Sequence, residues 1–234
     1  MAKISLFWFR IDPMLLFEDQ YRFEGLPLDR FGVFRAPDRR TRRRQILEAF
    51  HPPLDLLAHE LLARLNDGGG KAELRAHLPR LDWPAGYQPF CTWLALSPEV
   101  HGYQQKAQLN LGVHADYVAL RLGWDASQTS FSRFEFRARH GGLGKRMAEI
   151  AREHDLEFRV YASAPWPIGS RCVYRSAVDW QGAFEEVRRR GVWFELGRRY
   201  DLSDAGPLIG SDELAREALR VFRAVMPAAR SAWR

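Results

Sequence analysis

Residues 106–124, KAQLNLGVHADYVALRLGW, alternate apolar and polar side chains on both sides of a short turn. Leu109 and Leu111 occupy every second position before the turn, and Leu120 and Leu122 do so after it. Because successive side chains of a strand point to opposite faces, this alternation predicts an antiparallel hairpin with one apolar and one polar face. The residues expected on the polar face are Lys106, Gln108, Asn110 and Arg121.

At the turn of this hairpin, His114 and Asp116 stand two residues apart. An aspartate that accepts an imidazole N–H can orient a histidine for acid–base catalysis. Both residue types also tolerate turn geometry, and the pattern favours this simpler interpretation. The polar face of the two strands fits either a half-solvated surface or a groove for phosphates and bases.

Outside the hairpin, short runs of β-branched and aromatic residues predict further strands. They are 4–9, 31–35, 91–96, 158–162, 172–177 and 192–196. Helical periodicity is clearest at 54–65, 143–154, 182–190 and from Ser211 to Pro227. The strands crowd the middle of the chain, which predicts an α+β fold with a central, largely antiparallel sheet and helices packed mainly on one face. A chain of 234 residues is expected to form one domain, 1–234.

The positive charge of the chain is concentrated in residues 30–44, RFGVFRAPDRRTRRR. Seven arginines and one aspartate give this segment a net charge of +6, equal to that of the whole chain. Guanidinium groups bind phosphates in a bidentate manner, without reading base sequence. Salt bridges to nearby acids would explain the segment equally well, and both interpretations stay open. The candidate anion-binding residues are Arg35, Arg39, Arg40, Arg42, Arg43 and Arg44, with Asp38 as a predicted helix N-cap.

Several chemical signatures fail on spacing. The glycine-rich residues 141–146 lack the pattern of a phosphate-binding loop, and His59 lacks the second histidine of a helical zinc site. Cys91 and Cys172 lie far apart and are expected to be buried thiols. No metal site is predicted, and the sequence identifies no cofactor. The N-terminal apolar run ends at Arg10, too early for a signal peptide or a membrane span, so a cytoplasmic location without membrane contact is expected.

Residues 77–124 resemble the YktB-like family of uncharacterised bacterial proteins. The residues that carry the resemblance are His77, Arg80, Pro89, Thr92–Trp93, Ala95, Gly102–Tyr103 and the paired strands 106–124. The resemblance implies an α+β fold with a central, largely antiparallel sheet, and no established activity. Residues 160–200 depart from the family pattern, which suggests an elaboration of the fold.

Three functions remain open. The first is a nucleic-acid-associated or anion-binding protein that uses the segment 30–44 and the polar face 106–121. The second is a small-molecule-binding protein or enzyme, with a pocket near His77, Arg80, Tyr103, Lys106, His114 and Asp116. The third is a homo-oligomeric interaction module that buries Phe7–Trp8–Phe9 and Trp193–Phe194 in a subunit interface.

Overall fold

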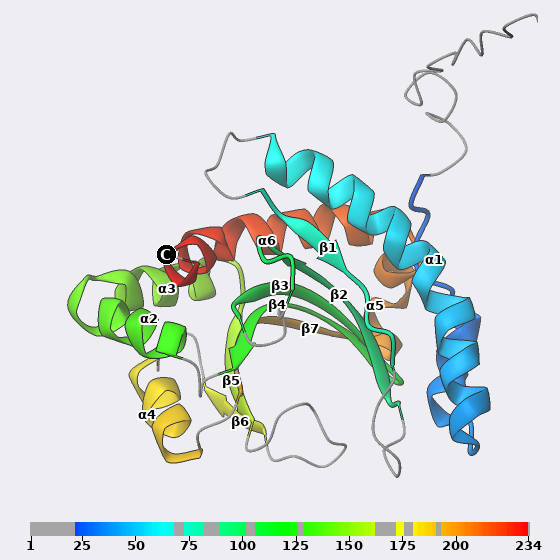
Figure 1. The fold of residues 1–234 in the computed structure, drawn as a ribbon, viewed down its shortest axis with the longest axis horizontal. Helices are drawn as coiled ribbons and strands as arrows, with labels where there is room; N and C mark the ends of the chain where they lie inside the picture. Colours follow the sequence, from blue (N-terminus) through cyan, green and yellow to red (C-terminus); the bar gives the residue numbers. More distant parts are fainter. Residues whose placement is uncertain are drawn as a thin grey trace, which may run out of the picture.

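The computed structural model describes residues 22–67, 73–81, 89–101, 106–125, 129–161, 172–175, 180–190 and 193–233. Within these residues the chain forms a seven-stranded sheet with helices packed against one of its faces (Figure 1). The strand order is β1-β2-β3-β4-β7-β5-β6, and every pair of neighbours is antiparallel. The predicted α+β class with a central antiparallel sheet is confirmed.

The strands are β1 (Arg75–His77), β2 (Cys91–Ser97), β3 (Gln108–His114), β4 (Tyr117–Asp125), β5 (Glu157–Tyr161), β6 (Cys172–Arg175) and β7 (Trp193–Asp201). The helices are the 3-10 helix η2 (Leu28–Arg35) and the α-helices α1 (Arg39–Asn66), α2 (Thr129–His140), α3 (Leu143–Glu153), α4 (Trp180–Arg190), α5 (Leu202–Ile209) and α6 (Glu213–Ala232). Although β7 comes last in the chain, it lies between β4 and β5, so part of the segment 160–200 belongs to the interior of the sheet.

The hairpin predicted from the alternation is formed by β3 and β4. Leu111 pairs with Leu120, and Asn110 pairs with Arg121. The connection is shorter than expected, because β3 continues through His114 and only two residues join the strands. The leucines of both strands are fully buried on the side of the sheet that α6 covers. The opposite side, called the inner face below, carries the polar residues of the hairpin.

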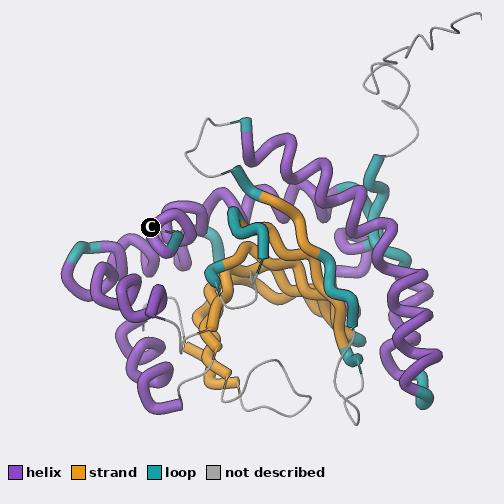
Figure 2. Tube along the Cα trace, viewed as in Figure 1, coloured by secondary structure: helices purple, strands orange, loops and turns teal. Residues whose placement is uncertain are grey.

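The sheet is curved, with α1 and α6 on its outer side (Figure 2). Gly112, Gly123 and Gly197 lie on the inner face of β3, β4 and β7. A Cβ atom on Gly197 would lie 2.2 Å from the carbonyl oxygen of Leu120, and one on Gly112 would lie 2.7 Å from Nη2 of Arg121. Glycine inside a strand permits such close approach and bending. These glycines therefore allow the curvature that brings the inner-face side chains together.

An aromatic cluster fills the outer side where β4, β5 and β7 meet α2 and α4. Trp124 contacts Phe134 at a ring-centroid distance of 4.4 Å, and Phe184 stacks on Phe194 at 5.4 Å. All four rings are fully buried. Edge-to-face and stacked ring pairs stabilise a core beyond the area they bury. This cluster holds α2 and α4 on the same side of the sheet as α6.

The strand predicted at 31–35 is wrong. These residues belong to η2, and the rings of Phe31 and Phe34 both lie 5.1 Å from the ring of Phe50 on α1. A 3-10 helix has three residues per turn and directs residues i and i+3 to the same side, whereas a strand would direct these two to opposite faces. The shared contact with Phe50 is thus compatible only with the helix.

Two helices run through prolines that were expected to bound them. The single helix α1 includes Pro52 and Pro53 and is longer than the predicted 54–65, and α6 passes Pro227 and ends at Ala232. Each interior proline removes one N–H and costs about 3 kcal/mol. Continuous burial of apolar side chains before and after the prolines outweighs this cost. The N-cap predicted for α1 is confirmed, because the Asp38 carboxylate accepts a 2.7 Å hydrogen bond from the Thr41 N–H.

Other expectations differ in smaller ways. The helix predicted to start at Ser211 begins at Glu213, and β1, α2 and α5 had not been predicted. The strand expected at 4–9 lies outside the described residues. Among the residues that the structure describes, no helix is both long and apolar enough to cross a membrane.

Replacing Gly197 by alanine should destabilise the fold by about 2–3 kcal/mol, because the added methyl group collides with rigid backbone of β4. Gly32→Ala is the matched control, since nothing lies within 4 Å of its Cβ position, and it should change stability by less than about 0.5 kcal/mol. Urea denaturation of both variants measures the difference. Equal stability of the two variants would contradict the close approach of β7 to β4.

Candidate functional site

The polar residues predicted for the hairpin lie together on the inner face, but they are buried and not half-solvated. Gln108, Asn110 and Arg121 are at most 2% exposed, and so is Glu195 of β7. Lys106 precedes β3 and is exposed. Buried ionised groups are costly unless they are paired and hydrogen-bonded, so an inner face of this kind requires a connected network.

A chain of polar contacts connects β3, β4 and β7. The Asn110 amide donates to Oε1 of Gln108 at 3.3 Å, and Nε of Arg121 donates to Oδ1 of Asn110 at 3.2 Å. Nη1 of Arg121 lies 3.0 Å from Oε1 of Glu195, which also accepts a 2.8 Å bond from the Trp193 indole N–H. The Arg121 guanidinium is thereby held flat across β3, in the space that Gly112 leaves open.

Two further arginines belong to the inner face. On β5, Nη2 of Arg159 lies 2.7 Å from Oε2 of Glu157. On β7, Nε of Arg199 donates to Oδ1 of Asp201 at 2.6 Å. Arg159 and Arg199 are therefore each kept in place by a carboxylate two residues away on the same strand, and together with Arg121 they come from three adjacent strands.

A stack of three side chains leads from the buried network toward the surface. The rings of His114 and Tyr117 are parallel to within 13°, with centroids 4.1 Å apart. The guanidinium of Arg199 lies 3.9 Å from the centroid of the Tyr117 ring. His114 is 6% exposed, while the side chain of Arg199 is 38% exposed. Solvent thus reaches the hairpin end of the inner face through Arg199.

The protonation states at this end follow from burial and from the arginines. Burial, with added repulsion from Arg121, Arg199 and Arg159, holds the pKa of His114 well below its usual range. Burial also raises the pKa of Tyr117. At neutral pH the imidazole is therefore uncharged and the phenol keeps its proton, so both can donate or accept hydrogen bonds.

Cys91 pairs with His114 in the β2–β3 register, which raises the question of a cysteine nucleophile. The side chain is buried, and burial raises the pKa of its thiol to about 12. A thiol that stays protonated at neutral pH is a poor nucleophile. Cys91 is therefore a buried structural thiol, as expected, while the side chain of Cys172 lies outside the described part of the chain.

The residues proposed for a pocket do not come together. His77 lies on the inner face of β1, across Ala95 from Asn110, and His114 lies about 13 Å further along β3 at 3.3 Å per residue. Arg80 is exposed, and its carbonyl oxygen accepts a 2.9 Å bond from Arg43.

Asp116 also lies apart from His77 and His114. Asp116 is exposed at the turn, where its carboxylate pairs with Arg35, whereas His114 points to the inner face and stacks on Tyr117. His114 is therefore a strand residue of the inner face and not the turn residue that the sequence favoured. Tyr103 lies outside the described residues.

Sequence reasoning missed the contribution of β7 to this site. Trp193, Glu195 and Arg199 alternate with the apolar residues Phe194 and Leu196, which is the same period-two signal that identified the hairpin. What the pattern could not show was that β7 pairs with β4, because the two strands are separated by more than sixty residues.

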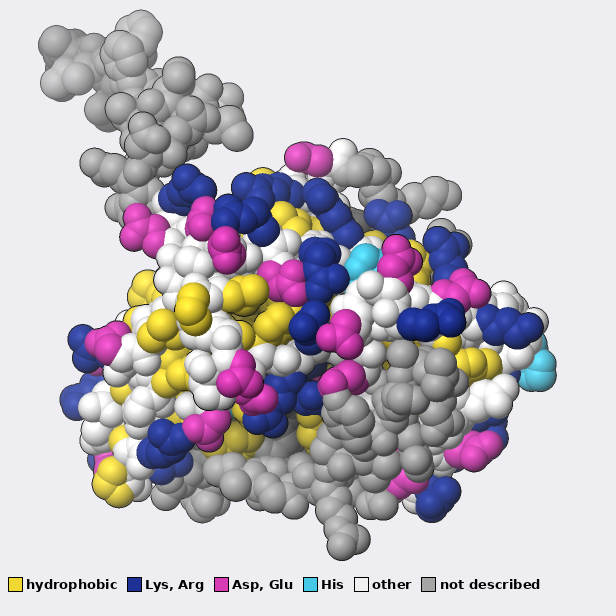
Figure 3. All heavy atoms as spheres, turned by 180° about the vertical axis from the view of Figure 1, so that it is seen from behind, with side chains coloured by type: hydrophobic (Ala, Val, Ile, Leu, Met, Phe, Trp, Pro, Cys, Tyr) yellow, Lys and Arg dark blue, Asp and Glu magenta, His cyan; other side chains and the backbone are white. Residues whose placement is uncertain are grey.

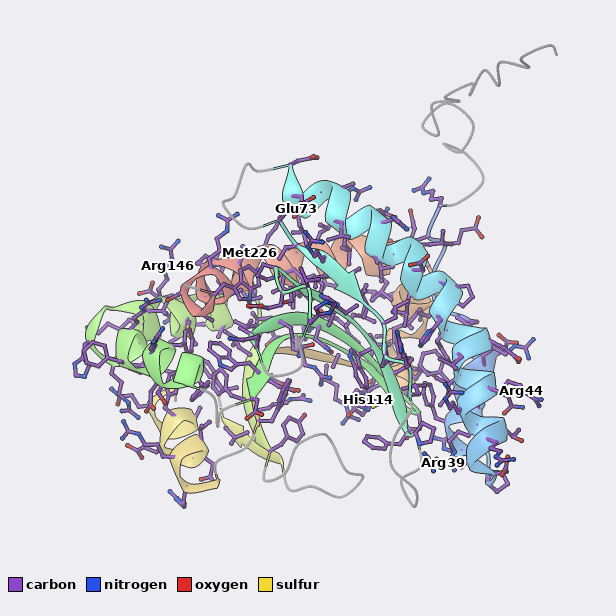
Figure 4. The ribbon with its side chains drawn as sticks, viewed as in Figure 1. Arg39, Arg44, Glu73, His114, Arg146 and Met226 are labelled. Atoms are coloured by element: carbon purple, nitrogen blue, oxygen red, sulfur yellow. The ribbon has the colours of Figure 1, made fainter. Side chains whose placement is uncertain are left out.

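The arginines of the segment 30–44 are in part structural. Arg42 is buried and donates a 2.6 Å bond to the carbonyl oxygen of Ala36, and Arg44 lies 3.9 Å from Glu48. Figure 4 shows Arg39 and Arg44 at the same end of the molecule as His114, with Arg44 directed away from the sheet. The segment therefore flanks the hairpin end of the inner face but does not line it.

No protein-family model matches the chain, and no curated protein matches it. The resemblance to the YktB-like family stays a prediction. Among the described residues, no group of three or more histidine, cysteine, aspartate or glutamate side chains could hold a metal ion. A function has to be inferred from the polar network and the charged surfaces themselves.

Replacing Glu195 by glutamine should lower the free energy of unfolding by about 3 kcal/mol or more, because it leaves the buried Arg121 charge without its carboxylate. Glu48→Gln removes the carboxylate of the exposed Arg44–Glu48 pair and should lower the free energy of unfolding by less than about 1 kcal/mol. Chemical denaturation at pH 7 compares the two variants. Similar losses in both would show that the Arg121–Glu195 pair is not buried in solution.

His114 should make the folded state less stable as the pH falls from 7 toward 5. Its pKa is lowered in the folded state, so in this range the unfolded chain binds a proton that the folded chain does not, and unfolding is favoured. The variant His114→Gln should lose less stability than the parent over this interval. The exposed His59→Gln serves as the control and should follow the parent. Thermal unfolding at several pH values tests this expectation.

Proposed function

We propose that the protein binds a small molecule bearing a carboxylate or phosphate group at the hairpin end of the inner face. The observation that supports this most strongly is the meeting of two nitrogen groups over Gly112. Nη2 of Arg121 and Nε2 of His114 lie 2.7 and 3.3 Å from the position of a Cβ on this glycine. The guanidinium of Arg121 and the neutral imidazole of His114 therefore both lie close to a residue that has no side chain. Two such nitrogen groups are suited to donate hydrogen bonds to an oxyanion.

The partly exposed Arg199 would supply the entrance to this site. Its guanidinium lies on Tyr117, which in turn stacks on His114, so the three side chains present successive donors from the surface inward. Arginine is the residue best suited to bidentate recognition of carboxylate and phosphate. The burial of the deeper residues favours a small molecule over a polymer, because only a narrow group could contact them.

The alternative functions receive less support. A nucleic acid would have to reach the polar face 106–121, but Gln108, Asn110 and Arg121 are at most 2% exposed. The oligomeric module would require an exposed Trp193–Phe194, but both side chains are buried in the sheet of a single chain, at 5% and 0% exposure. The other aromatic segment, Phe7–Trp8–Phe9, lies outside the described residues.

The proposal predicts binding of anionic small molecules that depends on Arg199. Isothermal titration against phosphate, dicarboxylates and nucleoside monophosphates, with a neutral sugar as the negative ligand, should identify at least one anion that binds. Arg199→Gln should weaken its binding about tenfold, equivalent to about 1.4 kcal/mol. Arg22→Gln, a surface arginine paired with Asp212, is the matched control and should bind as the parent does.

The protonation of His114 gives a second readout. A bound anion near the imidazole would offset the repulsion from the arginines, so the pKa of His114 should rise on binding. NMR titration of the imidazole resonances measures this change. The proposal would be refuted if an anion bound to Arg199→Gln as tightly as to the parent and did not shift the His114 resonances, because the ligand would then lie elsewhere.

A further inference from the structure

Arginines line a cavity of about 1010 Å³ among α1, α2 and α6, away from the inner face of the sheet. Arg64 comes from the end of α1, Arg137 from α2, and Arg223 and Arg230 from α6. Apolar side chains, among them Met226 (labelled in Figure 4), form part of the wall. Four cationic side chains from three helices therefore face one open space, together with one carboxylate, that of Asp67 at the end of α1.

The basic surface continues along α6 beyond this cavity. Arg220, Arg223 and Arg230 follow Arg216 at offsets of four, seven and fourteen residues, which places all four on one face of a helix with 3.6 residues per turn. At a rise of 1.5 Å per residue the row is about 21 Å long. A second cavity of about 640 Å³ adjoins the first, shares Arg64 and Arg223 with it, and adds Arg216 and Arg220.

The charge of this row is uncompensated mainly at its C-terminal half. Arg216 and Arg220 pair with acidic residues of their own helix. In contrast, Arg137 and Arg223 donate to main-chain carbonyl oxygens, and within the described part of the chain no ion pair involves Arg137, Arg223 or Arg230. Figure 3 shows arginine and lysine side chains, with acidic side chains between them, across the upper part of the molecule seen from behind.

An exposed aromatic ring lies on the same helix as Arg137. Phe136, which precedes Arg137 on α2, is 65% exposed, and its ring centroid lies 4.7 Å from that of His140. Cationic side chains together with exposed aromatic rings are the combination with which proteins bind single-stranded nucleic acid, through phosphates and stacked bases.

We propose that this surface binds a single strand of RNA or DNA, with phosphates on Arg137, Arg223 and Arg230 and a base stacked on Phe136. Arg223 and Arg230 are seven residues, or about 10 Å, apart along α6, which exceeds the size of one phosphate group and fits a chain of phosphates. Because the contacts are to phosphates and to the face of a base, binding is independent of sequence. The site is separate from the inner face and does not depend on the function proposed there.

The test is fluorescence anisotropy of the full-length protein with labelled single-stranded oligo(U) and oligo(dT), against a duplex of the same length and a polyglutamate peptide. The single strands should bind most tightly, with affinity falling steeply between about 50 and 300 mM salt. Three phosphate contacts correspond to a log–log slope of about −2. Arg223→Glu/Arg230→Glu should weaken binding at least about thirtyfold, and Phe136→Ala about tenfold.

Arg40→Glu/Arg44→Glu is the matched control, because it makes the same change of charge on the other basic segment, and it should alter binding less than about threefold. The neutral pair Arg223→Gln/Arg230→Gln replaces the glutamate variant if circular dichroism shows that the latter does not fold. The proposal is overturned if both double variants weaken binding equally, if Phe136→Ala has no effect, or if the duplex or the polyglutamate peptide binds as tightly as the single strands.

Discussion

The buried ion pair between Arg121 and Glu195 constrains the arrangement of the whole sheet. The two residues lie on neighbouring strands, and their positions differ by two residues along the strands. Arg121 is paired with Gly197, and Glu195 is paired with Gly123. A slip of β4 by one residue would turn Arg121 to the outer side of the sheet, away from Glu195. The cost of an unpaired buried charge therefore fixes the register of β4 against β7, and with it the glycines that let the sheet bend.

The curvature and the polar network depend on each other. Close contact between β7 and β4 is possible only because Gly197 has no side chain, and the same bend directs side chains of β4, β5 and β7 toward one another. In the same way, the absence of a side chain on Gly112 leaves room for the Arg121 guanidinium. On the convex outer side, where a bent sheet spaces its side chains more widely, large aromatic rings fill the additional volume. Glycines inside and aromatic rings outside are thus two parts of one solution to building a bent sheet.

The distribution of charge along the chain predicts only part of the distribution of charge on the surface. The segment 30–44 contains the net excess of the chain, yet Arg42 is buried against Ala36 and Arg43 holds the carbonyl oxygen of Arg80. When charges are summed along the chain, Glu213 and Glu217 offset part of the positive charge of the α6 arginines. Helical spacing and the approach of α1 and α2 bring them into one surface, which a count of charges along the chain does not detect.

The sequence by itself determined the elements whose signals are local. Alternation at 106–124 defined both strands of the hairpin and separated Gln108, Asn110 and Arg121 from the leucines, because side-chain direction in a strand depends only on position. Only the tertiary structure decided that β7 joins β4, that the polar face is buried, and that α1 and α6 continue through their prolines. These outcomes depend on pairing and burial between residues far apart in the chain, and no local periodicity records which distant partner a strand or a helix will meet.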